Sequence, residues 1–381
     1  MIKRPLPFVD PVIDDAELNK VIDVIKSKWL VEGKVVHELE DKFKDFVGTK
    51  YALAVTNGTT ALHLAMEGIG INPGDEVITT PFTFIASVNS ISFVGGIPKF
   101  VDIDPKTWEI DPKEIKKAIT PKTKAILPVH IFGLPSNMPE IMEIAEENDL
   151  LVIEDAAQAH GAKINGKHVG GFGHVAAFSF YATKNMIAGE GGMVVTNDEE
   201  LRDKMESIKN HGRPKKGGYL HLRIGYNFRM TDLCAAVGLA QLEKLPTLLN
   251  KRAKNAERLR KIIDQIEEIE YQFVPKGYTH ANYVFAIKLS SSEKVDQLIT
   301  YLKDNNIRSR RIYSTLAYKQ PAYQNIKEWR WAKVLEYPDY SKVKTPIAKD
   351  IATTHMEIPV VPTLTQEELK YLEKVLLNWN G

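Results

Sequence analysis

The stretch Leu151-Val152-Ile153-Glu154-Asp155-Ala156-Ala157-Gln158 decides the fold, because it joins a continuous apolar run to a carboxylate. A short apolar run without polar alternation is typical of a strand that is buried on both faces of a parallel sheet. We therefore predict a buried strand over 150–154, with Asp155 at its C-terminal end.

A second apolar run leads to a lysine: Phe178-Ser179-Phe180-Tyr181-Ala182-Thr183-Lys184-Asn185, followed by Gly189-Glu190-Gly191-Gly192. Lysine side chains normally stay in water. This one follows a predicted strand and precedes a glycine-rich turn, so we expect the chain to carry the Lys184 ammonium group into an interior cleft. For an isolated lysine, a side chain that extends from the strand end to water would be the simpler interpretation.

Strand-like and helix-like segments alternate from about residue 50 to residue 200. The predicted strands are 51–55, 76–80, 97–101, 124–129, 150–154, 175–180 and 193–196, and the helices between them include 59–70, 84–93 and 136–148. This alternation predicts an α/β fold with a mostly parallel central sheet covered by helices. Functional loops then lie at the C-terminal ends of the strands, where Asp155 and the turn after Val55 are found.

The second half of the chain predicts a smaller α+β unit. Its segments are a helix over 199–210, a basic loop over 211–219, a helix over 231–245, a charged helix from 247 to about 269, a strand over 283–289, and helices over 293–305 and 366–377. Because a proline disrupts a helix interior, we expect the helix over 231–245 to stop at Pro246. The prediction is a large domain over 1–245, including the N-terminal segment, and a linker helix with a small C-terminal domain over 246–381.

The composition is that of a globular protein with balanced charge. The chain has 381 residues, 44% of them hydrophobic and 26% charged, and 50 basic against 49 acidic residues give a net charge of +1. This balance gives no electrostatic argument for nucleic acid or a membrane as the main partner. No apolar run approaches the roughly 18–20 residues that span a bilayer, and no apolar h-region follows the N-terminus. We expect a cytoplasmic protein.

Lys184 and Asp155, delivered to one pocket by two strands, are the pair that pyridoxal phosphate chemistry requires. The lysine forms a Schiff base with the cofactor's aldehyde, and the aspartate pairs with the protonated pyridine nitrogen. A buried carboxylate without a partner is strongly destabilising, so Asp155 needs a cationic or well-bonded neighbour. A helix cap and a carboxylate near water are the alternatives.

The turn Asn57-Gly58-Thr59-Thr60-Ala61-Leu62-His63 joins the strand that ends at Val55 to the next helix. Such a junction presents free backbone N–H groups and the positive end of a helix to an anion. A phosphate group fits here, with the hydroxyl of Thr59 or Thr60 adding a hydrogen bond. An N-cap followed by an ordinary helix explains the sequence at least as well.

Three further residues have both a binding and a structural interpretation. Gln158 is placed to reach the cofactor's ring oxygen, or it is a surface glutamine. Phe84 is an aromatic ring stacked on the flat cofactor, or a core residue. Ser179 is a second phosphate ligand, or a strand residue and nothing more. Each structural interpretation is adequate for its own residue. The candidate residues, however, follow one another along the chain in the order that one cofactor site needs, and this favours a single binding site.

Six segments resemble the DegT/DnrJ/EryC1/StrS family of sugar aminotransferases. They are 27–46, 58–62, 74–87, 154–161, 178–196 and Gly225-Tyr226-Asn227-Phe228-Arg229-Met230. The resemblance covers nearly the whole chain. It implies the fold of pyridoxal phosphate-dependent transferases of fold type I (aspartate aminotransferase-like), with a mostly parallel sheet and a small α+β C-terminal domain.

The resemblance also implies what the residues around the cofactor ring do. Lys184 would form the Schiff base and move a proton between the carbon atoms of cofactor and substrate. Asp155 would keep the pyridine nitrogen protonated, so that the ring acts as an electron sink. Gln158 would contact the ring hydroxyl, and Phe84 would stack on the ring.

The cofactor's phosphate would be held by a second group of residues. Within one subunit the implied ligands are Gly58, Thr59, Thr60 and Ser179. Asn227 would reach the same phosphate from a neighbouring subunit, so the active unit would be at least a homodimer. No set of metal ligands is predicted.

The implied reaction transfers an amino group from L-glutamate to a nucleotide-linked keto sugar. Glutamate would leave as 2-oxoglutarate, and the pyridoxamine form of the cofactor would then aminate the sugar. The stretch 188–193 resembles relatives that aminate C4 of 4-keto-6-deoxy sugars more than those that act at C3. The basic loop over 211–219 is a site for the nucleotide diphosphate or a solvated loop. Tyr318 stands where the family often has a histidine.

Three other functions are alternatives to C4 amination. A 3-keto sugar aminotransferase of the same family is one. A pyridoxamine-dependent sugar dehydratase is another, but that group replaces the Schiff-base lysine with histidine, so Lys184 argues against it. A non-enzymatic regulator is disfavoured by the lysine–aspartate pair and by the lack of a helix-turn-helix or basic reading helix.

Overall fold

The computed structural model describes residues 4–214 and 217–379. Its largest sheet has seven strands in the order β1-β9-β8-β5-β4-β2-β3. They are β1 (Tyr51–Val55), β2 (Glu76–Thr79), β3 (Ile97–Phe100), β4 (Thr123–Leu127), β5 (Leu151–Asp155), β8 (Val175–Ser179) and β9 (Gly192–Thr196). β9 runs antiparallel to both of its neighbours, and the other pairs of strands in this sheet are parallel. The mostly parallel sheet predicted from the sequence is therefore confirmed.

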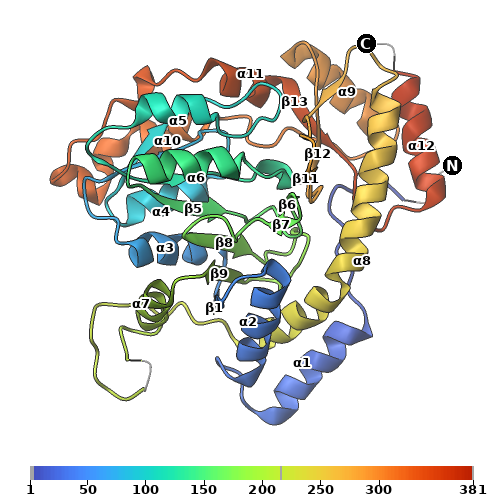
Figure 1. The fold of residues 1–381 in the computed structure, drawn as a ribbon. Coiled ribbons are helices and arrows are strands. Elements are labelled where there is room, and N and C mark those ends of the chain that lie inside the picture. The colour runs from blue at the N-terminus through green and yellow to red at the C-terminus, as the bar shows by residue number, and fades with distance from the viewer. Residues whose placement is uncertain (1–3, 215–216, 380–381) are drawn as a thin grey trace.

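Helices cover both faces of this sheet (Figure 1). On one face, apolar side chains of the strands pack against α3 (Gly58–Ile69), α4 (Ile85–Phe93) and α7 (Glu199–Lys209). On the other face, alternate strand residues pack against α2 (Lys34–Val47), α5 (Pro112–Ala118), α6 (Met138–Glu147) and the first half of α8 (Asp232–Ile263). Because successive strand side chains point to opposite faces, the continuous apolar runs supply both layers at once.

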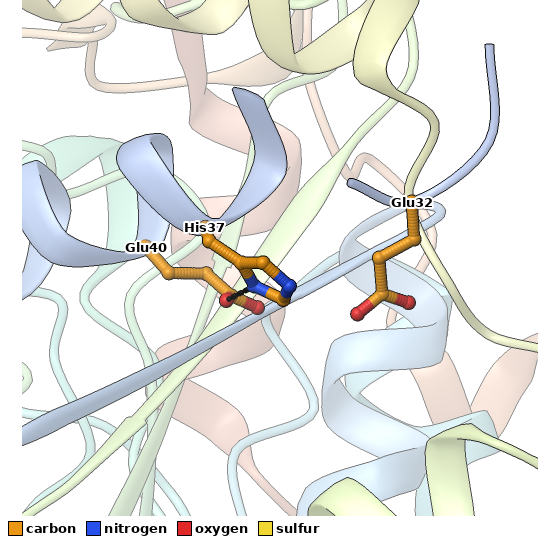
Figure 2. A group of neighbouring side chains, drawn as sticks. All are labelled: Glu32, His37 and Glu40. Carbon is orange, nitrogen blue, oxygen red and sulfur yellow. Dashed lines mark hydrogen bonds and ion pairs between the residues drawn. The ribbon is translucent and has the colours of Figure 1, made fainter. Parts of the chain in front are cut away.

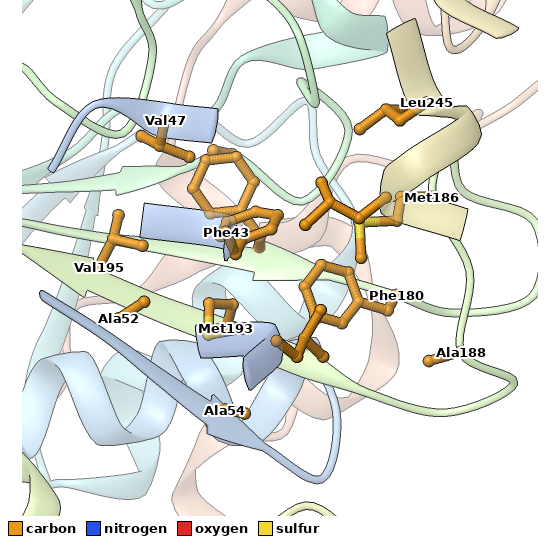
Figure 3. Packing of buried hydrophobic residues seen from close by; sticks show 14 of the residues in the cluster. Phe43, Val47, Ala52, Ala54, Phe180, Met186, Ala188, Met193, Val195 and Leu245 are labelled. Atoms are coloured by element: carbon orange, nitrogen blue, oxygen red, sulfur yellow. The ribbon is translucent and has the colours of Figure 1, made fainter. Parts of the chain in front are cut away.

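The core beside β8 fixes the start of the segment that carries Lys184. Figure 3 shows Phe43, Phe180 and Met193 among the packed side chains of this cluster. The Phe43 ring centroid lies 5.1 Å from that of Phe178 and 5.3 Å from that of Phe180, both at edge-to-face angles. Such pairs add a directional attraction to the burial of apolar area. The chain therefore leaves β8 from a rigid anchor on α2.

The expectation that a helix ends at Pro246 is wrong. Helix α8 is 32 residues long, passes through this proline and ends at Ile263, short of the expected residue 269. Proline removes one helical hydrogen bond, but tertiary packing outweighs that loss here. Leu242 and Leu245 are buried in the core next to the large sheet, and Ala256 and Leu259 are buried in the C-terminal core. Both halves are thus held, and α8 bridges the two units.

The C-terminal unit is built on a three-stranded antiparallel sheet of β10 (Glu270–Tyr271), β12 (Phe285–Lys288) and β13 (His355–Ile358). Its longer helices are α9 (Ser292–Asp304), α11 (Pro346–Thr354) and α12 (Gln366–Leu377). Leu6 pairs with Ile307 and joins this core, so the N-terminal segment packs on the smaller unit. We propose that residues 246–381 form the small domain, with residue 6 attached to it.

The remaining elements are one helix of 13 residues, α1, and several short segments. They are α1 (Asp15–Ser27), α10 (Pro321–Gln324), the strands β6 (Lys163–Ile164), β7 (Lys167–His168) and β11 (Tyr278–Thr279), and the 3-10 turns η1 (Ile131–Gly133), η2 (Ala317–Lys319), η3 (Ile326–Glu328), η4 (Arg330–Lys333) and η5 (Tyr340–Lys342). Within residues 4–214 and 217–379, no helix combines the length and apolar composition that a bilayer crossing needs.

Candidate active site

One large cavity, of about 1240 Å³, opens at the C-terminal ends of β1, β5 and β8. It is lined by eight of the nine residues that the sequence singled out: Gly58, Thr59, Thr60, Phe84, Asp155, Gln158, Ser179 and Lys184. The ninth, Asn227, is exposed and does not line the cavity of its own chain. The C-terminal edge of a parallel sheet is the expected place for such a site, since several strands deliver their ends to it.

Asp155 is the buried anion of the cavity. It is the last residue of β5, with only 4% of its surface exposed. The Ser87 hydroxyl donates to Asp155 Oδ2 at 2.7 Å, and the Ala157 N–H donates to Oδ1 at 3.1 Å. Burial raises the pKa of the Asp155 carboxyl, while these two donors and the positive charge of Lys184 oppose the increase. A cation bound beside this carboxylate would remove the cost of burying its charge.

Gln158 is held so that one end of its amide faces a tyrosine. The Phe132 N–H donates to Gln158 Oε1 at 2.8 Å, so the amide nitrogen of Gln158 points the other way. Gln158 Nε2 donates to the Tyr313 hydroxyl at 3.0 Å. The side chain is 4% exposed, so the alternative of a surface glutamine does not hold. Since an amide nitrogen carries two protons, one remains for an oxygen in the cavity.

The turn before α3 forms the end of the cavity that is suited to an anion. Asn57 caps the helix: its side chain accepts from the Thr60 N–H at 2.9 Å, and its own N–H donates to Thr60 Oγ1 at 3.1 Å. A Cβ on Gly58 would lie 2.6 Å from Ser179 Cβ, so only glycine allows β8 to approach this helix end. The turn is thus an N-cap and also an accessible helix N-terminus with free N–H groups.

Phe84 and Ser179 both line the cavity. Phe84 is 55% exposed, so its side chain is not a core residue as one interpretation held, and its ring lies 6.4 Å from that of Tyr313. Ser179 ends β8 and faces the turn before α3. An exposed aromatic ring inside a cavity offers a flat surface on which a planar ligand can stack.

Lys184 reaches the cavity from the segment that follows β8. Its Nζ atom lies 4.4 Å from the ring centroid of Tyr283. The nearby His160 is fully buried, and burial together with the charge of Lys184 lowers its pKa to about 3, so this imidazole is neutral at physiological pH. The charge of Lys184 also acts to lower the pKa of the Asp155 carboxyl, so the two side chains lie within electrostatic reach of each other.

Three residues of the site were missed by sequence reasoning: Ser87, Tyr283 and Tyr313. Ser87 lies in α4, and the two tyrosines come from loops of the second half of the chain. Tyr313 adopts a left-handed backbone conformation with φ of 57°, which is unusual for an aromatic residue and turns its side chain toward Gln158. No local pattern marks these positions, because their roles arise only from tertiary contact.

Two further sequence expectations concern groups outside the cavity. Arg213 of the basic loop lies over the Tyr219 ring, 5.7 Å from its centroid, and Lys215 and Lys216 of that loop lie outside the described residues. Tyr318 is buried, and its hydroxyl contacts the Thr345 hydroxyl at 3.1 Å. Neither Arg213 nor Tyr318 lines the cavity.

One cluster outside the cavity has the composition of a metal site. The ligand atoms of Glu32, His37 and Glu40 lie within 4.8 Å of one another, and Figure 2 shows the His37 ring between the two carboxylates. The fully buried Lys209, however, places its Nζ atom 3.1 Å from Glu32 and 3.2 Å from Glu40. This ammonium group supplies the positive charge that a metal ion would otherwise bring, so the cluster is explained as an ion-pair network.

The residues of the cavity fit pyridoxal phosphate in three independent ways. Asp155 is a buried carboxylate without a cation in bonding contact among the described residues, as a pyridinium nitrogen requires. Lys184 places a primary amine in the same space. The N-terminus of α3 provides N–H groups for a dianionic phosphate. A carboxylate, an amine and an anion site are the groups that this cofactor uses.

Comparison with known proteins gives the same family as the motifs. Residues 11–376 match the model of the DegT/DnrJ/EryC1/StrS aminotransferase family. The GDP-perosamine synthase of Escherichia coli O157:H7 is 36% identical over 368 residues, which cover 96% of each chain. The UDP-N-acetyl-3-dehydro-alpha-D-glucosamine 3-aminotransferase of Acidithiobacillus ferrooxidans is 34% identical over 382 residues, covering 97% of each.

The fold is also similar to solved structures of aminotransferases. S. venezuelae DesV, crystallised in complex with a ketimine intermediate, superposes with a TM-score of 0.91 at 30% identity and 99% coverage of both chains. The aspartate aminotransferase-like fold expected from the sequence is thereby confirmed. The chain belongs to the DegT/DnrJ/EryC1/StrS aminotransferase family and is a pyridoxal phosphate-dependent sugar aminotransferase.

Proposed function

We propose that this enzyme transfers the amino group of L-glutamate to C4 of a nucleotide-linked 4-keto-6-deoxy sugar, and that it does so in the cytoplasm. The observation that supports a large substrate is the volume of the cavity around Lys184 and Asp155, about 1240 Å³. Ligand pockets usually measure about 300–1,000 Å³. The cavity therefore has room for a sugar nucleotide beside a cofactor.

Each predicted residue has a defined task in this reaction. When bound, the cofactor carries the amino group between the two substrates and accepts the electron pair released at the reacting carbon. Lys184 would hold the cofactor through its aldehyde and would move a proton between the carbon atoms of cofactor and substrate. Asp155 would keep the ring nitrogen protonated, and Gln158 would donate to the ring oxygen.

The anion site completes the positioning of the cofactor. Gly58, Thr59, Thr60 and Ser179 surround the N-terminus of α3 and would bind the phosphate. Asn227 is exposed and would serve the cavity of a second subunit in a homodimer. Two side chains that precede Asn227 in the chain, Tyr219 and Ile224, are each 92% exposed and support a partner surface in this segment.

The choice of C4 depends on the stretch 188–193 and on the relatives named GDP-perosamine synthase, to which the chain is similar. A second candidate is amination at C3, because the relative named as a 3-aminotransferase is similar over the same length. Both reactions use the same lysine and aspartate. They differ in how the sugar ring is presented to the cofactor, so a panel that contains both classes of keto sugar distinguishes them.

The test follows the visible absorbance of the bound cofactor. Glutamate should convert the purified holoenzyme to its pyridoxamine form, with loss of the visible band. A panel of nucleotide-linked 4-keto-6-deoxy sugars and 3-keto sugars is then added one at a time. We expect only a 4-keto sugar to restore the band, because only its carbonyl would sit at the cofactor carbon.

Two outcomes would contradict the proposal at different levels. Restoration of the band by a 3-keto sugar alone would exclude C4 amination and leave the enzyme class intact. A holoenzyme whose spectrum glutamate does not change would exclude glutamate as the donor. The matched control is Lys184→Ala, which retains the cavity but lacks the amine and should show no visible band from a lysine–cofactor bond.

A further inference from the structure

The segment that carries Lys184 is clamped on both sides to residues 281–283. Thr183 Oγ1 and the Tyr283 hydroxyl form a hydrogen bond of 3.0 Å, and Asn185 Nδ2 donates to the Ala281 carbonyl at 3.0 Å. The residues immediately before and after Lys184 are thus fixed to the same short segment. This double attachment sets the position from which the lysine side chain starts.

The segment 281–283 is itself fixed to the rest of the site. The Ala281 N–H donates to the Gly133 carbonyl at 2.8 Å, and Arg252 of α8, which is 6% exposed, donates from Nη1 to the Tyr283 carbonyl at 3.4 Å. Phe132, next to Gly133, is the residue that orients Gln158. The Tyr283 ring therefore occupies a defined place relative to both the lysine and the predicted cofactor contacts.

The free ammonium group of Lys184 rests on this ring. Its Nζ atom lies 4.4 Å from the Tyr283 ring centroid, within the range of a cation–π interaction. Among residues 4–214 and 217–379, no hydrogen bond or ion pair to the Lys184 ammonium is found. The charge of Lys184 acts to lower the pKa of both Asp155 and His160, and Tyr283 acts to raise the pKa of Tyr313 and of Arg252. Within the part of the chain that the structure describes, the Tyr283 face is thus the specific contact of this cation.

We propose that Tyr283 is a positioning residue that docks the Lys184 ammonium group whenever the lysine is not bonded to the cofactor. In a full transamination cycle the lysine would be released in the half-reaction with the amino donor and would bond to the cofactor again at the end of the half-reaction with the amino acceptor. Between these two events it needs a resting place that keeps it within reach of the cofactor. The Tyr283 face provides that place. The proposal uses the lysine–cofactor bond but depends on neither the sugar nor the amino donor.

The dock has a thermodynamic consequence that can be measured without turnover. In the cofactor-free protein and in the complex with pyridoxamine phosphate, Lys184 is free and docked. In the complex with pyridoxal phosphate, the lysine is bonded and the dock is lost. Removing the ring should therefore increase the affinity for pyridoxal phosphate relative to the affinity for pyridoxamine phosphate. The reason is that only the binding of pyridoxal phosphate breaks the contact between Lys184 and the ring.

The experiment compares Tyr283→Leu, which removes the ring, with Tyr283→Phe, which keeps the ring and removes the hydroxyl. Dissociation constants for both cofactor forms are measured with the full-length cofactor-free chain at one pH. We expect the ratio Kd(pyridoxal phosphate)/Kd(pyridoxamine phosphate) to fall about tenfold in Tyr283→Leu and to stay unchanged in Tyr283→Phe. General damage to the site would weaken both cofactors alike and leave the ratio unchanged in both variants.

An unchanged or increased ratio in Tyr283→Leu would overturn the proposal, as would an equal fall in Tyr283→Phe, which would assign the effect to the Thr183 hydrogen bond. A second measurement needs no folded variant of Tyr283. Reductive methylation of wild-type cofactor-free protein with isotope-labelled formaldehyde should give a Lys184 methyl resonance shifted upfield by the ring current, identified by its absence in Lys184→Arg. A Lys184 resonance at the position of solvent-exposed lysines would refute docking.

Discussion

At the scale of single residues, Asp155 has the most demanding environment in the site. Burial raises its pKa, whereas the role proposed for it requires an ionised carboxyl that pairs with a protonated ring nitrogen. In the cofactor-free protein the pKa of the Asp155 carboxyl lies above the unperturbed value of 3.8. The carboxyl therefore gains a proton, and loses its charge, as the pH falls through this raised pKa. We therefore expect affinity for pyridoxal phosphate to weaken progressively at acid pH, before unpaired aspartates elsewhere titrate, as measured by spectroscopic titration.

The variant Asp155→Asn separates this charge from the shape of the side chain. Ser87 and the Ala157 N–H can still contact the amide, so the fold should persist. Turnover should fall on the order of 10²–10³-fold, because the variant lacks the charge that stabilises the protonated ring. Its cofactor affinity should be weak and independent of pH over the acid range. Near-normal turnover, or an acid dependence identical to that of wild type, would contradict the assigned role.

At the scale of elements, the N-terminus of α3 divides two tasks between adjacent threonines. Thr60 Oγ1 donates to the Asn57 carbonyl at 2.8 Å and accepts the Asn57 N–H, so its hydroxyl serves the helix cap. No hydrogen bond to the Thr59 hydroxyl is found among the described residues, although Thr59 lines the cavity. The cap should contribute to stability, and the free hydroxyl should contribute to phosphate binding.

Thr60→Val should therefore lower the free energy of unfolding by about 1 kcal/mol, measured by urea denaturation of the cofactor-free protein. Thr59→Val should leave that stability unchanged and weaken pyridoxal phosphate binding about tenfold, because it removes a hydrogen bond to a charged group. Each variant is the control for the other, with both measurements made on both proteins. If Thr60→Val weakened the cofactor more than Thr59→Val did, the division of tasks would be refuted.

The same elements show what local sequence can predict. The strands β1 and β5 were found from apolar runs to within one residue, because a doubly covered strand must be apolar throughout. The helix end predicted at Pro246 was wrong, because the packing of α8 on two cores outweighs the local effect of a proline on a helix. β13 was missed, since its four residues include the buried polar side chains of His355 and Glu357.

At the scale of the whole molecule, the site is built from segments that lie far apart in the sequence. Residues at strand ends were predictable because topology brings strand ends together, and Asp155 and Ser179 line one cavity as expected. Tyr283 and Tyr313 enter the cavity from the C-terminal unit, so their roles depend on how that unit packs on the sheet. The cavity belongs to the assembled chain and to no single domain.

Asn227 extends this argument beyond one chain. It is exposed, paired with Asn210 at an isolated bridge, and absent from the cavity lining of its own chain, whereas the resemblance assigns it to the phosphate. Both statements hold if it serves the neighbouring subunit of a two-fold dimer. A loss of cofactor affinity in Asn227→Ala would not identify which subunit it serves, so a complementation test is needed.

In that test, Lys184→Ala and Asn227→Ala chains are co-expressed with different tags, and the mixed dimer is purified through both tags. One of its two cavities would combine an intact Lys184 with an intact Asn227 from the opposite chain, so about half of the wild-type activity per dimer should return while each variant homodimer stays impaired. If Asn227 served its own chain, each cavity of the mixed dimer would carry one defect and activity would not recover. A dual-tagged complex that cannot be isolated, with the active wild type sedimenting as a monomer, would refute the dimer itself.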